Sequence, residues 1–230
     1  MPNFEDGQSD PLKRVRERVE DQAHDHWHEF AVIVASANVL SALVLYGRIL
    51  ATAHPNRVTY VAIAIAITST LAAMFAYYSI QVGILFVAGP LRLAEVFVSF
   101  MIAAAQLALF LWPAYVLSDQ VGDPKAGLEG LRQWLVFFAL FSFAGPLANW
   151  HAARTRRLRN PTLVVTEYES SQRRDRNSGF VCCALVTTCW AASFCWPTLA
   201  LAVGLGIAAV GVIFGTISQE RVAKQIVNSL

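Results

Sequence analysis

Charged residues are scarce in this chain of 230 residues. Lys, Arg, Asp and Glu make up 15% of it, whereas about 25% is typical of soluble domains. Hydrophobic residues make up 56% and occur in long blocks, with the charges gathered between them. A membrane-spanning helix needs about 20 mostly apolar residues in a row. The sequence therefore predicts an all-α, polytopic membrane protein.

Several signatures of chemistry are also missing. The chain has no Gly-rich phosphate-binding loop and no G-x-S-x-G motif. Its four cysteines share one apolar block, with no C-x-x-C pair and no neighbouring His, which argues against a zinc site or a disulfide framework; they are Cys182, Cys183, Cys189 and Cys195. We therefore predict no enzyme activity, no catalytic residue and no cofactor.

Lysine is rare among the 18 basic residues, since only Lys13, Lys125 and Lys224 are not arginine. Arginine in place of lysine, together with abundant alanine, is typical of a high-GC bacterial genome. The polar N-terminal stretch is not a cleavable signal sequence. These features predict a multi-pass protein of the bacterial cell membrane, meaning the inner or plasma membrane.

The apolar blocks predict six spans. They cover 30–50, 58–88, 93–117, 134–150 and 180–215. The last block is too long for one crossing, and a proline interrupts a helix, so it is expected to turn at Trp196-Pro197 as a helical hairpin. If the N-terminus is cytoplasmic, all of the 18 Lys and Arg except Arg48, Arg57, Lys125 and Arg132 fall inside. This asymmetry predicts that both termini are cytoplasmic.

Five regions follow from this topology. The first is a cytoplasmic amphipathic segment, in which a helix begins at Asp10-Pro11. A basic loop between the fourth and fifth spans should lie at anionic lipid headgroups. The regions are 1–29 (N-terminal segment), 30–151 (spans one to four), 152–179 (basic loop), 180–217 (hairpin of spans five and six) and 218–230 (cytoplasmic tail).

The third span carries a stripe of polar side chains at helical spacing: Arg92, Glu95, Ser99 and Gln106. Ionisable residues within spans commonly face the bundle interior or water, so the stripe could form a cation or proton pathway, which the mid-helix Asn38 of the first span could also line. Alternatively, Arg92 and Glu95 form an ion pair at the interface, while Gln106 and Asn38 bond neighbouring helices.

Small residues mark the sixth span. Gly204, Gly211 and Gly215 lie on one helical face, where small residues let helices approach closely. The contact could serve the monomer, a homo-oligomer or a membrane protein partner. The arginines expected at the headgroups are Arg154, Arg156, Arg157 and Arg159. Because they adjoin a helix end, topology and lipid explain them, and no nucleic-acid partner is expected.

One weak metal pair remains, because His24 and His28 share a helical face; a solvated polar face near the membrane interface is the favoured interpretation. Three classes of function stay open, of which a membrane-embedded enzyme has the least support in the sequence. The first is a non-catalytic scaffold, accessory subunit or membrane-acting effector that works through partners or oligomerisation. The alternative is a small ion or proton channel or transporter that uses the stripe on the third span.

Overall fold

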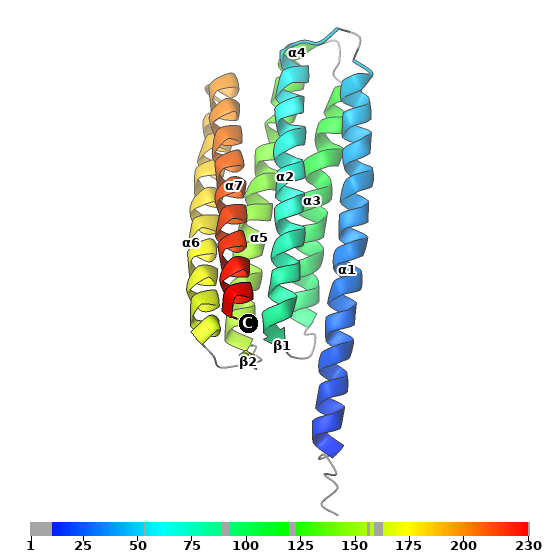
Figure 1. The fold of residues 1–230 in the computed structure, drawn as a ribbon. Helices are drawn as coiled ribbons and strands as arrows, with labels where there is room; N and C mark the ends of the chain where they lie inside the picture. Colours follow the sequence, from blue (N-terminus) through cyan, green and yellow to red (C-terminus); the bar gives the residue numbers. More distant parts are fainter. Residues whose placement is uncertain are drawn as a thin grey trace, which may run out of the picture.

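The computed structural model describes residues 11–52, 54–88, 93–119, 123–155, 157–158 and 163–229. Long helices lie side by side in one bundle, and successive long helices run in opposite directions (Figure 1). The elements are α1 (Pro11–Leu50), α2 (Arg57–Phe86), β1 (Val87–Ala88), α3 (Leu93–Asp119), α4 (Pro124–Leu131), α5 (Gln133–Thr155), β2 (Arg157–Leu158), α6 (Leu163–Ala192) and α7 (Pro197–Ser229).

Five helices of this bundle are long and apolar enough to cross a membrane. These spans are Trp27–Leu50, Arg57–Gln81, Val96–Asp119, Pro124–Leu147 and Pro197–Arg221. The architecture is therefore that of a multi-pass helical membrane protein. The predicted fifth span differs, because α6 is apolar only in its second half.

Helix α6 nevertheless packs against α5 and α7. It begins at Leu163, so much of the segment 152–179 is helical, and the prediction of a loop there is wrong for those residues. The turn predicted at Trp196-Pro197 is confirmed, since α6 ends at Ala192 and α7 begins at Pro197.

The N-terminal segment and the first span form one helix of 40 residues, α1. At 1.5 Å per residue it is about 60 Å long, twice the hydrocarbon thickness of a bilayer. Its N-terminal part extends well beyond the other helices (Figure 1). The helix begins at Pro11 as predicted, whereas Asp10 lies outside the described residues.

Three small elements were not predicted. Helix α4 precedes α5, and Asp123 caps it by accepting hydrogen bonds from the backbone N–H groups of Lys125 and Ala126. Strands β1 and β2 pair antiparallel at the opposite end of the bundle, with Val87 opposite Leu158. The pairing joins the chain after α2 to the chain after α5.

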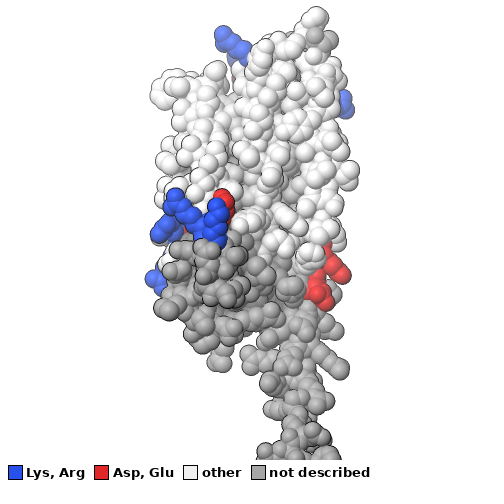
Figure 2. All heavy atoms as spheres, in the orientation of Figure 1, with Lys and Arg blue, Asp and Glu red and all other residues white. Residues whose placement is uncertain are grey.

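Charges are confined to the two ends of the bundle. The stretches 30–47, 58–91, 96–118, 133–153 and 177–219 contain no Lys, Arg, Asp or Glu, and Figure 2 shows a broad uncharged surface between the charged groups at its upper end and those further down the bundle. About 20 helical residues rise ~30 Å, which matches the hydrocarbon core. The second half of α6 shares this band with the five spans.

The interior is built largely from small and aromatic side chains. Trp134, Phe110 and Phe138 are fully buried between helices. On α2, the small residues Ala62, Ala66, Ser69 and Ala76 are buried. Large apolar side chains such as Ile33 and Leu40 of α1 instead point outward, as expected for a surface in contact with lipid.

Candidate functional site

The two mid-helix polar residues singled out on the first and third spans meet in the structure. Asn38 of α1 donates a hydrogen bond from Nδ2 to Oε1 of Gln106 on α3, at 3.0 Å. Both side chains are at least 95% buried. An amide left alone in hydrocarbon is costly, so each side chain satisfies part of the other's hydrogen-bonding capacity. The contact joins α1 to α3.

A second buried contact links three helices through one hydroxyl group. Ser69 of α2 donates to the backbone oxygen of Leu109 on α3 at 3.1 Å. The same hydroxyl accepts a hydrogen bond of 3.0 Å from Nε1 of Trp134 on α5. Ser69 and Trp134 are both fully buried. One side chain therefore fixes the relative positions of α2, α3 and α5.

A proline four residues after Leu109 explains why the carbonyl of Leu109 accepts a hydrogen bond from another helix. Pro113 is inside the helix and has no N–H, so it cannot donate to the carbonyl of Leu109 four residues earlier. A carbonyl freed in this way needs another donor inside a membrane bundle. Ser69 supplies it across the helix interface.

The third polar contact lies towards the end of the bundle where the chain ends. Gln219 of α7 donates from Nε2 to Oδ2 of Asp175 on α6 at 2.6 Å. Asp175 Oδ1 and Gln219 Oε1 are buried, and within the described part of the chain neither accepts a hydrogen bond. The pair therefore contains two buried oxygens with no donor.

Burial raises the pKa of Asp175 above its ordinary value, because the interior disfavours the charged carboxylate. Hydrogen bonds from Ser218 and Gln219 and the nearby charge of Arg174 lower the pKa, but they offset only part of this effect. A protonated carboxyl group is also a donor. Asp175 is thus a carboxyl group whose environment favours the neutral form.

The predicted stripe on α3 is only partly described. Gln106 is buried and Ser99 is half-buried on α3. Arg92 and the side chain of Glu95 lie outside the described residues, and so does their expected ion pair. The same holds for the arginines predicted to meet lipid headgroups: the side chains of Arg154 and Arg157, and the whole of Arg156 and Arg159.

The glycines of α7 pack as small residues should. A Cβ atom on Gly204 would lie 2.7 Å from Leu135 Cδ2, and one on Gly215 would lie 2.9 Å from Phe75 Cε2. At Gly211 the nearest atom would be Cys182 Sγ, also at 2.9 Å. These glycines therefore face α5, α2 and α6 of the same chain, and each permits a close approach.

Metal binding gains no support from the geometry. Over the described ranges, no group of three or more His, Cys, Asp or Glu side chains is placed to hold a metal ion. Of the weak pair on α1, His28 is exposed and the side chain of His24 lies outside the described part. The cysteines are free thiols in the structure.

Comparisons of the chain with known protein families, curated proteins and solved structures found no match.

The sequence analysis missed the contacts centred on Ser69 and on Asp175. The sequence did contain a signal for the Ser69 contact, because a proline inside a span frees the carbonyl four residues earlier. The proline alone could not identify Ser69 of α2, 40 residues away, as the donor to that carbonyl. For the second, Gln219 was not distinguished from the rest of the polar tail.

Proposed function

We propose that this chain is a non-catalytic component of the bacterial cell membrane, a scaffold, accessory subunit or membrane-acting effector that works through partners or oligomerisation. One observation carries the proposal. Asn38 and Gln106, two polar side chains buried within the bundle, bond each other across α1 and α3. Together with the Ser69 contact, they hold helices together.

A six-span topology with both termini in the cytoplasm accompanies this role. Successive long helices alternate in direction, and α1 begins at the end of the bundle where α7 finishes (Figure 1). An even number of crossings follows if α6 crosses with its uncharged half. The distribution of Lys and Arg then favours this end as the cytoplasmic one.

The N-terminal part of α1 is the place where we expect a partner to bind. Its backbone continues as helix beyond the bundle (Figure 1), and an isolated helix of this length is marginal without a surface to pack on. Its apolar residues recur at helical spacing at Leu12, Val15 and Val19. A partner protein or the anionic bilayer surface would supply the missing contact.

The alternative function, a small ion or proton channel or transporter, requires the stripe on α3 to line a path. The bond between Gln106 and Asn38 counts against it, because both amides are enclosed between helices. Proteoliposomes that contain the purified protein separate the two functions. The scaffold role predicts no flux of protons or monovalent ions above that of empty liposomes. Flux that falls in Glu95→Gln would establish the channel and overturn the proposal.

A further inference from the structure

An arginine lies beside an aromatic ring at the end of the bundle opposite the chain's C-terminus. Arg132 is at the junction of α4 and α5, and its guanidinium carbon lies 4.2 Å from the centre of the Phe194 ring. Its Nε atom is buried and donates to no acceptor in the described structure. Among the described residues Arg132 also forms no ion pair.

A second donor without an acceptor contacts the same ring. The rings of Trp190 and Phe194 are 5.3 Å apart, nearly perpendicular. Trp190 Nε1 is buried and, within the residues described, has no hydrogen-bond partner. Buried N–H groups are nearly always paired in proteins. Two unpaired donors beside one aromatic ring, one of them cationic, indicate that an anionic oxygen ligand belongs there.

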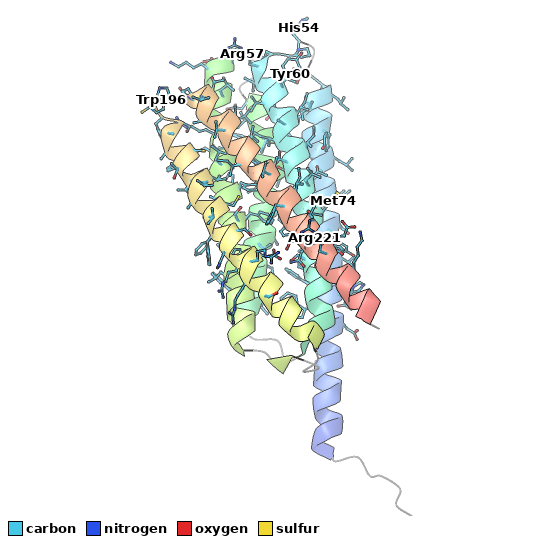
Figure 3. All side chains as sticks on the ribbon, turned by 60° about the vertical axis from the view of Figure 1, so that its left-hand side comes forward. His54, Arg57, Tyr60, Met74, Trp196 and Arg221 are labelled. Atoms are coloured by element: carbon cyan, nitrogen blue, oxygen red, sulfur yellow. The ribbon has the colours of Figure 1, made fainter. Side chains whose placement is uncertain are left out.

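The surface around these donors is apolar and exposed. Phe194 is 56% exposed, and Trp196 and Leu199 are each 65% exposed. Trp196 lies at the turn between α6 and α7, at the same end of the bundle as His54 and Arg57 (Figure 3). Tryptophan is enriched where membrane meets water. A ligand that fits both features carries an anionic group next to hydrocarbon chains.

We propose that Arg132, Trp190 and Phe194 form a binding site for the phosphate group of a membrane phospholipid. The guanidinium group donates charge-assisted hydrogen bonds to the phosphate oxygens while it stacks on Phe194. The indole N–H of Trp190 donates to the same headgroup. The acyl chains cover Trp196 and Leu199. This site is at the opposite end from the arginines near residue 157, and it does not depend on the scaffold role.

The test is native mass spectrometry of the full chain in neutral detergent, titrated with dioleoylphosphatidylglycerol. Dioleoylglycerol, which has the same chains and no phosphate, and inorganic phosphate are titrated in parallel. We expect the tightest phosphatidylglycerol site to weaken about tenfold or more in Arg132→Gln. Arg57→Gln, which removes an exposed charge at the same end, should leave that affinity unchanged.

Trp190→Phe is the second variant, since it keeps the aromatic ring and removes only the N–H. We expect a weaker loss, of a few-fold, with unchanged melting temperature in the absence of lipid. Dependence on Arg132 for inorganic phosphate but not for the lipid would assign the site to the free anion and overturn the lipid proposal. Equal loss in Arg132→Gln and Arg57→Gln, or tight binding of dioleoylglycerol, would also overturn it.

Discussion

Asn38 and Gln106 form a side-chain hydrogen bond between α1 and α3 at 3.0 Å, and both are buried. The two residues are 68 positions apart. Helices in lipid gain little hydrophobic stabilisation from contact with each other, so such bonds carry weight in holding them together. To line a pathway for ions or protons, the same side-chain atoms would have to be free of this hydrogen bond.

Replacing Gln106 with Leu should destabilise the bundle. The change leaves the Asn38 amide with no partner in an apolar interior, and we expect a loss of about 0.6–2 kcal/mol in the free energy of unfolding. Unfolding in mixed micelles with increasing SDS measures it. Ser36→Ala is the control, because Ser36 is exposed and bonds only within its own helix, to the oxygen of Val32; it should change little. If the loss of unfolding free energy in the double variant Asn38→Leu/Gln106→Leu equals the sum of the losses in the two single variants, the hydrogen bond contributes nothing to stability.

Ser69→Ala should cost more than an ordinary loss of a hydroxyl. It removes the donor to Leu109 and the acceptor for Trp134 together, and each buried group left unpaired costs about 1–3 kcal/mol. Pro113→Ala restores an N–H that can bond the Leu109 carbonyl within α3. The cost of Ser69→Ala should therefore be smaller in a Pro113→Ala background. Equal costs in both backgrounds would mean that the freed carbonyl is not what Ser69 satisfies.

Two glycines less than one turn apart on α7 form a matched pair. Gly204→Ala places a methyl group 2.7 Å from Leu135 Cδ2 and 3.2 Å from Cys189 Cβ, so overpacking should cost about 1–3 kcal/mol. A Cβ atom on Gly206 would have nothing within 4 Å, and alanine favours helix more than glycine does. Gly206→Ala should be neutral or slightly stabilising. Thermal unfolding in detergent compares them, and equal melting temperatures would contradict the packing of α7.

Asp175 makes stability depend on pH in a defined direction. Its folded-state pKa lies above the ordinary value of 3.8, so the folded state binds the proton more tightly than the unfolded chain. The stability it contributes is present below pH 3.8 and is lost as pH rises through the folded-state pKa. Asp175→Asn should remove this loss and be more stable than wild type at neutral pH.

The measurement for Asp175 is the difference in unfolding free energy between wild type and Asp175→Asn, taken from pH 4 upward. Glu129→Gln serves as a control, since Glu129 lies near the opposite end of the bundle and is exposed. A difference that stays constant with pH would mean that the carboxyl group has the same pKa in both states.

Local sequence signals predicted the positions of the helices well. The turn at Trp196-Pro197 and the division of residues 58–117 into two helices follow from proline and glycine acting on the nearest turn of helix. The glycines of α7 were identified because helical spacing places them on one face. These features depend on residues that are close to one another in the sequence.

The partners of the polar groups could not be predicted in the same way. Asn38 and Gln106 stood out singly, but their pairing depends on how α1 and α3 are rotated about their axes. The start of α6 was missed because its first half is polar and resembles a loop in composition. The rotation of α1 and α3 depends on tertiary packing, which local sequence patterns do not encode.

The central claim is that α6 crosses the membrane with its uncharged half, which gives six spans. Cys195 lies exposed in the turn between α6 and α7, so the chain carries its own probe. In intact cells, a membrane-impermeant maleimide should label wild type and not Cys195→Ser. In the Cys195→Ser background, Arg174→Cys should be labelled only after the membrane is permeabilised. Labelling of Cys195 only after permeabilisation, or of Arg174→Cys in intact cells, would contradict the account.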